Sequence, residues 1–137
     1  MNYVLSHVVE KCTGCGDCVK ACAEGHEGLA NCRIFAVGKS FAYFSCMQCK
    51  KPQCAQVCPT FALERQGEVV LFHRSFCVGC KNCIEGCPWG VPRFNSDVGI
   101  IGKCDLCVDR VLSGERPLCV ASCPNSALEI KELGKKE

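Results

Sequence analysis

The sequence is poor in large apolar side chains and has no long apolar run. Only seven Phe, two Tyr and one Trp occur among its 137 residues. No stretch approaches the roughly 18 consecutive apolar residues of a membrane-spanning helix, so we expect no direct insertion into a membrane. The first residues resemble neither a secretion signal nor a twin-arginine signal. We therefore expect a cytoplasmic protein, in a reducing compartment where disulfides are rare.

The sequence also lacks the motifs of several enzyme classes. It contains no GxSxG, P-loop or HExxH motif, and no C-x3-C-x2-C run of the kind that radical S-adenosylmethionine enzymes use. It has no basic stripe, and its formal net charge is only +2. A nucleic-acid partner is therefore not expected.

Cysteine is the residue that the chain has in excess. Seventeen of the 137 residues are Cys, a fraction that indicates a disulfide or metal scaffold. The odd count and the missing secretion signal disfavour disulfides. Sixteen of the cysteines form four groups of four: group one is Cys12, Cys15, Cys18 and Cys22; group two is Cys46, Cys49, Cys54 and Cys58; group three is Cys77, Cys80, Cys83 and Cys87; group four is Cys104, Cys107, Cys119 and Cys123.

The spacing within these groups points to iron–sulfur clusters. Groups one and three both read C-x2-C-x2-C-x3-C, which is the ligand run of bacterial-type [4Fe–4S] ferredoxins. Group two has two extra residues before its third cysteine, and group four has a long insertion there. Proline follows the last cysteine of groups two, three and four. Four zinc sites would use the same residue type, but zinc typically takes separated C-x2-C pairs.

Short apolar segments indicate which groups belong together. Between groups two and three, Phe61–Leu63 and Val69–Phe72 read as strands around a turn at Gln66-Gly67. Tyr3–Val8 and Ser126–Ile130 would pair as the terminal strands of a second unit. We therefore expect an α+β fold of two nested bacterial-ferredoxin-like units, with short strands and helices: a split unit of residues 1–30 plus 100–137, and an inserted unit of residues 40–99.

The ligand sets follow from this pairing. In two-cluster ferredoxins the fourth cysteine of each run holds the neighbouring cluster. The expected cofactors are thus four [4Fe–4S] clusters: cluster 1 on Cys12, Cys15, Cys18 and Cys123; cluster 2 on Cys22, Cys104, Cys107 and Cys119; cluster 3 on Cys46, Cys49, Cys54 and Cys87; cluster 4 on Cys58, Cys77, Cys80 and Cys83.

The pattern resembles one family of iron–sulfur subunits. The four groups, the altered spacing of groups two and four, and the phrases CPWGVPRF and GKCDLC are similar to the four-cluster subunits of molybdopterin oxidoreductases such as dimethyl sulfoxide reductase and formate dehydrogenase. They are also similar to the iron–sulfur subunits of formate hydrogenlyase and carbon monoxide dehydrogenase. The resemblance implies a nested pair of ferredoxin-like units and a chain of clusters that carries electrons in anaerobic metabolism.

The expected function is electron transfer without catalysis. Sixteen thiolates would fill the iron positions of four clusters, leaving none open to a substrate. Four sites of charge −2 would change the formal charge from +2 to about −6. The expected partner is a formate dehydrogenase or hydrogenase, alternatively a carbon monoxide dehydrogenase, and possibly another ferredoxin-like subunit. A maturation factor or a diffusible polyferredoxin remains open.

Five residues outside the groups have weaker interpretations. Cys32 is expected to lie in a strand as a buried free thiol, because unpaired cysteine usually behaves as a small hydrophobe. Trp89 is expected to pack beside a cluster. The thiolate count leaves no ligand role for the three histidines, His7, His26 and His73, and His26 reads as a loop residue.

Overall fold

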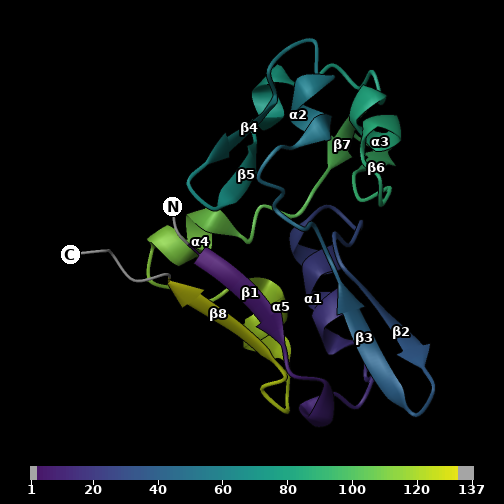
Figure 1. Cartoon of the computed structure of the whole chain (residues 1–137), viewed down its shortest axis with the longest axis vertical. Coiled ribbons are helices and arrows are strands. Elements are labelled where there is room, and N and C mark those ends of the chain that lie inside the picture. The colour runs from purple at the N-terminus through teal and green to yellow at the C-terminus, as the bar shows by residue number, and fades with distance from the viewer. Residues whose placement is uncertain (1–2, 133–137) are drawn as a thin grey trace. The chain divides into compact units, whose positions relative to one another are not determined.

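The fold is a set of two-stranded sheets and short helices. The computed structural model describes residues 3–132. Within that range it contains four antiparallel strand pairs and helices of nine residues or fewer (Figure 1). The predicted α+β class is confirmed. The chain divides into two units, one of Cys46–Asp105 and one of the described residues up to Ser45 and from Leu106 onwards. They are called unit 1 and unit 2.

Unit 1 contains two hairpins and two short helices. In the first hairpin Leu63 lies opposite Phe72, and in the second Phe94 lies opposite Ile101. Their inner faces form a small core with two cysteines, Cys54 and Cys83. The elements are α2 (Gln53–Gln56), β4 (Leu63–Gln66), β5 (Val69–Phe72), the 3-10 turn η2 (Arg74–Phe76), α3 (Asn82–Gly86), β6 (Arg93–Asn95) and β7 (Ile100–Gly102).

Unit 2 is closed by strands from the two ends of the described chain. Leu5 lies opposite Ile130, and His7 lies opposite Leu128, so the predicted pairing of these segments is confirmed. Figure 1 shows the two strands side by side. The elements are β1 (Tyr3–His7), the 3-10 turn η1 (Val9–Lys11), α1 (Asp17–Gly25), β2 (Arg33–Val37), β3 (Ser40–Phe44), α4 (Val108–Leu112), α5 (Leu118–Ser122) and β8 (Leu128–Glu132).

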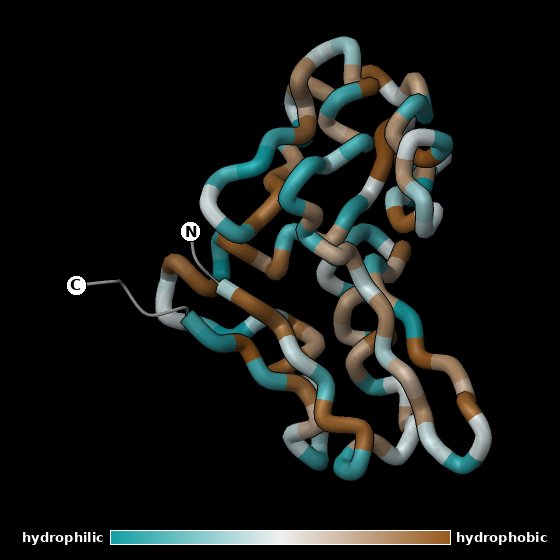
Figure 2. Tube along the Cα trace, in the orientation of Figure 1, coloured by the Kyte–Doolittle hydropathy of each residue, from teal (hydrophilic) through white to brown (hydrophobic). Residues whose placement is uncertain are grey.

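Cysteines also form part of the core in unit 2. Cys18 and Cys119 are buried with Val120 and Leu128, and α1 packs against α5. Figure 2 shows that apolar residues occur along the chain in short segments rather than in one long run. A core made partly of thiols is therefore incomplete without whatever the thiols bind.

Three expectations about local structure are wrong. Phe61 and Ala62 lie outside β4, which begins at Leu63, because Phe61 has a left-handed backbone with φ of +59°. Cys32 precedes β2, which begins at Arg33. The turn between β4 and β5 falls at residues 67–68, one residue later than expected.

The unit boundaries also differ from those expected. Ser40–Phe44 lies in unit 2 rather than in the inserted unit, because it pairs with Arg33–Val37 as a hairpin that was not predicted. Ile100–Gly102 lies in unit 1, because it pairs with Arg93–Asn95. Strand pairing therefore decides both boundaries.

Candidate iron–sulfur sites

All four cysteine groups begin with the same kind of loop. The residue immediately before the second cysteine has a positive φ in every group, between +49° and +72°. Glycine is the residue that adopts this conformation without strain, and groups one and three have it. Groups two and four bend in the same way with larger side chains: the four residues are Gly14, Gln48, Gly79 and Leu106.

A second shared turn follows each Cys-Pro pair. The third residue after the cysteine is again left-handed, at Phe61, Gly90 and Ser126. This turn directs the next backbone N–H back to the cysteine sulfur. The donors and acceptors are Ala62 to Cys58 at 3.3 Å, Val91 to Cys87 at 3.5 Å, and Ala127 to Cys123 at 3.2 Å.

In group one, which lacks the proline, the sulfur of the last cysteine accepts its hydrogen bond from a more distant residue. The N–H of Asn31 donates to Cys22 Sγ at 3.2 Å across nine residues. Backbone N–H groups aimed at sulfur stabilise a thiolate and tune a bound cluster. The spacing of the sequence indicated the cysteines, but the conformation of these turns could not be read from it.

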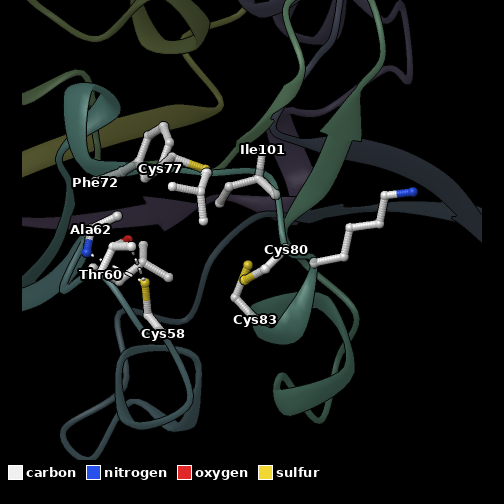
Figure 3. Close-up of a pocket in the computed structure, with 11 residues that line it drawn as sticks. Cys58, Thr60, Ala62, Phe72, Cys77, Cys80, Cys83 and Ile101 are labelled. Atoms are coloured by element: carbon white, nitrogen blue, oxygen red, sulfur yellow. Dashed lines mark hydrogen bonds between the residues drawn. The ribbon is translucent and has the colours of Figure 1, made fainter.

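One cavity in unit 1 is surrounded by four cysteines. Cys58, Cys77, Cys80 and Cys83 line this cavity. Figure 3 shows the sulfurs of Cys58 and Cys77 apart from each other and from those of Cys80 and Cys83, which lie together in this view, with dashed lines marking the bonds to Cys58. Cys58 comes from group two and the other three come from group three. The rest of the lining is mainly apolar: Ala62, Leu63, Phe72, Val78 and Ile101, with Thr60 and Lys81.

Two further cavities are also lined by four cysteines each. One in unit 2 is lined by Cys12, Cys15, Cys18 and Cys123. One in unit 1 is lined by Cys46, Cys49, Cys54 and Cys87. Three of the four expected ligand sets are thus each brought together around a cavity.

The fourth expected set is described only in part by unit 2. Cys22, Cys107 and Cys119 belong to unit 2, whereas Cys104 belongs to unit 1, which ends at Asp105. His26 Nε2 lies 3.9 Å from Cys107 Sγ, and the Tyr43 hydroxyl donates to Cys119 Sγ at 3.4 Å. His26 lies in the turn that follows α1, outside the helix as expected. Sequence spacing gave no signal for either contact.

The thiols of unit 2 influence one another strongly. Cys32, which is 3% exposed, donates its thiol hydrogen to the Cys18 carbonyl oxygen at 3.9 Å. Its thiol also lowers the pKa of Cys22 to about 5 and that of Cys18 to about 7. The same contacts raise the pKa of Cys32 itself. The expected free thiol is therefore buried and stays protonated beside two candidate ligands.

His26 is held as a cation in the same region. Its contacts with Cys107 and Cys22 raise its pKa to about 10. Burial, together with neighbouring cysteines, raises the pKa of Cys83 and of Cys119 to about 11. Buried thiols of this kind ionise readily only when a metal binds them.

The donor groups around the cavities fit an iron–sulfur cluster. Within residues 3–132, no group of three His, Cys, Asp or Glu side chains converges on a single point. The thiolate donors, the N–H groups aimed at sulfur and the mainly apolar lining of the cavities fit that cofactor.

The remaining residues of interest lie near these cavities. Trp89 lines the cavity of Cys46 and is 54% exposed. His7 lines the cavity of Cys12. His73 instead contacts Glu64, at 2.6 Å, on the surface of unit 1.

Comparison with known proteins gives consistent matches. A family model described as a 4Fe-4S dicluster domain matches residues 37–133. The B subunit of the anaerobic dimethyl sulfoxide reductase of Escherichia coli (strain K12) is 36% identical, over 92% of this chain and 73% of its own length. The thiosulfate reductase electron transfer subunit PhsB of Salmonella typhi is 32% identical, over 99% of this chain and 79% of its own.

A third relative matches more locally. The iron-sulfur subunit of the nitrate-inducible formate dehydrogenase of Escherichia coli (strain K12) is 41% identical, over 61% of this chain and 29% of its own length. Among the described residues, no helix has the length and apolar character needed to cross a membrane. The cysteine cavities and these matches lead to one assignment: the chain belongs to the 4Fe-4S dicluster family, and its cofactors are [4Fe–4S] clusters.

Proposed function

We propose that this chain is a non-catalytic electron-transfer subunit, which relays single electrons through four [4Fe–4S] clusters to or from a catalytic oxidoreductase subunit. The observation that supports it is the set of three cavities, each lined by three cysteines of one group and one of another. A bound [4Fe–4S] cluster supplies reversible one-electron chemistry. The units would then be a nested pair of ferredoxin-like modules.

The residues of the chain hold and insulate the cofactors. The proposed ligands are the sixteen grouped cysteines in the four crossed sets given above, and Cys32 is the one cysteine outside them. Backbone N–H groups such as those of Ala62 and Ala127 stabilise the thiolates. Side chains such as Phe72 and Ile101 limit the access of water to the cavity of Cys58, which helps to set a reduction potential.

A catalytic role for this chain is disfavoured by the ligand count. Four thiolates fill the iron positions of each proposed cluster, so no iron is open to a substrate. The chemistry would belong to a partner. The relatives named above are subunits of dimethyl sulfoxide reductase, thiosulfate reductase and formate dehydrogenase, so we propose a molybdopterin oxidoreductase as the partner class. Formate dehydrogenase remains the candidate expected from the sequence.

The hydrogenase and carbon monoxide dehydrogenase partners rest on the resemblance of the sequence alone, and the cytoplasmic location stays a prediction.

Anoxic affinity isolation from the native host tests the partner class. We expect a stoichiometric catalytic subunit and about sixteen irons for each copy of this chain, after the irons of the partner are subtracted. Isolation of the chain alone with its iron would instead support a diffusible carrier or a transient maturation factor. About four zinc ions per chain would contradict the proposal.

Substitution of single cysteines tests the crossed ligand sets. Cys58→Ser and Cys80→Ser should alter the same electron paramagnetic resonance signal, although the two residues come from different groups. Cys46→Ser should alter another signal. Cys32→Ser is the matched control, because it removes a buried thiol outside the sets and should leave about sixteen irons per chain. A change of the same signal by Cys58→Ser and Cys46→Ser would refute the crossed assignment.

A further inference from the structure

One buried charge lies beside a cysteine cavity. Lys103 is 4% exposed and is the one buried charged residue within residues 3–132. It follows β7 and lines the cavity of Cys46, Cys49, Cys54 and Cys87. An ammonium group out of contact with water is unfavourable unless other groups compensate its charge.

Among the described residues, the groups that compensate this charge are the dipoles of two backbone carbonyls. Lys103 Nζ donates to the carbonyl oxygens of Val70 and Cys104, both at 2.6 Å. Within the described chain it contacts no carboxylate. A cluster with four thiolates carries a net charge of about −2, so the cofactor of this cavity is the anion that the ammonium would face.

Gln48 supports the same backbone without a charge. Its side-chain Nε2 donates to the Cys104 carbonyl at 2.9 Å, and its Oε1 accepts from the Val70 N–H at 2.7 Å. The backbones of Val70 and Cys104 are therefore bridged by two side chains, the cationic Lys103 and the neutral amide of Gln48. This duplication separates the electrostatic role of Lys103 from its structural role.

The other two cavities have no comparable charge. The cavity of Cys58 is lined by Lys81, but that side chain is exposed to solvent, and its Nζ lies 4.2 Å from the centroid of the Phe94 ring. The cavity of Cys12 has His7 as its one basic lining residue. Water screens an exposed charge, whereas a buried charge acts through a lower effective dielectric constant of about 20.

We propose that Lys103 raises the reduction potential of the cluster held by Cys46, Cys49, Cys54 and Cys87. The inference rests on the proposed function. Reduction adds one electron from the redox partner, changes the cluster core from +2 to +1, and forms or breaks no bond. The ammonium favours this step because the added charge is negative.

The test is a redox titration of the anoxically isolated complex, followed by electron paramagnetic resonance. Lys103→Met removes the charge and Lys103→Arg keeps it. We expect Lys103→Met to lower one midpoint potential, so that the reduced-to-oxidised ratio of that cluster at a fixed potential falls about tenfold, which equals about 59 mV. Lys103→Arg should leave the potential near the wild-type value.

Two further variants make the result decisive. Cys49→Ser identifies the signal of this cluster, which must be the one that shifts. Lys103→Gln replaces Lys103→Met if that variant loses iron. The inference is overturned if neither neutral variant shifts the signal, if Lys103→Arg shifts it as far as the neutral variants do, or if both neutral variants lose the cluster. A wild-type chain without iron at this ligand set would instead refute the proposed function.

Discussion

The loop of group three contains a glycine that should tolerate no side chain. Gly79 has φ of +72°, and a Cβ atom built there would lie 2.3 Å from the backbone carbonyl oxygen of Gly99. A backbone atom cannot rotate away as a side chain can. Gly79→Ala must therefore move either the ligand loop between Cys77 and Cys80 or the turn that joins β6 and β7.

The expected loss of stability in Gly79→Ala is the sum of two separable effects. A left-handed backbone at a residue with a Cβ costs about 1–2 kcal/mol. Overpacking against a fixed neighbour typically costs a further 1–3 kcal/mol or so. Gly90 provides the matched control, because its φ is +62° and nothing lies within 4 Å of a Cβ built there. Gly90→Ala should show only the first effect, and the gain from restricting the unfolded chain is common to both variants.

The assay is thermal bleaching of the visible cluster absorption, measured anoxically at one scan rate because cluster loss is irreversible. We expect the midpoint of Gly79→Ala to lie about 5–10 °C below that of Gly90→Ala, with lower iron content per chain. Equal midpoints and equal iron content in the two variants would refute the steric reasoning. A larger loss in Gly90→Ala would refute it as well.

Three further predictions concern the thiols and their neighbours. The His26 pKa is raised from 6.5 to about 10 in the folded chain, so its charge stabilises the fold fully below pH 6.5 and loses this effect as the pH rises through 10. The midpoint of anoxic thermal bleaching should therefore lie lower in His26→Gln than in the wild type, by an amount that shrinks over this interval, and a difference that grows would contradict the assignment. Tyr43→Phe removes the hydroxyl that donates to Cys119 Sγ and should lower the same midpoint by a few degrees, the equivalent of about 1 kcal/mol, whereas an unchanged midpoint would show that the bond contributes nothing. Anoxic removal of iron should abolish cooperative unfolding by circular dichroism, because Cys54, Cys83, Cys18 and Cys119 form part of the two cores, and an apo-protein with the wild-type transition would contradict this view.

Much of the fold could be predicted because the strands are short and apolar. The segment at Tyr3 and the segment at Leu128 flank the cysteine groups, and their antiparallel pairing is confirmed. Phe61 was misplaced for a physical reason. Aromatic residues favour strands, but here the turn after Cys58 requires a left-handed residue so that the Ala62 N–H can reach the sulfur. A local propensity was overruled by a hydrogen bond.

The candidate site, like the fold, could be predicted from the sequence only in part. The grouping of the cysteines follows from spacing, and the structure places three complete sets around cavities; that these sets bind clusters as assigned stays a prediction. Long-range contacts had no signal in the sequence. His26 and Cys107 are separated by 81 residues, and Lys103 and Val70 by 33. Their proximity depends on how the hairpins pack, which periodicity does not report.

The repeated turns explain why cysteine spacing predicts so much of this molecule. Each group places a left-handed residue immediately before its second cysteine, whether that residue is Gly79, Gln48 or Leu106. A bulky residue in this conformation is strained and persists only where its surroundings determine it. Gln48 meets this condition through the two hydrogen bonds of its side chain, to Val70 and to Cys104. The left-handed residue before the second cysteine is therefore shared by all four groups, and in group two the side chain of Gln48 compensates for the missing glycine.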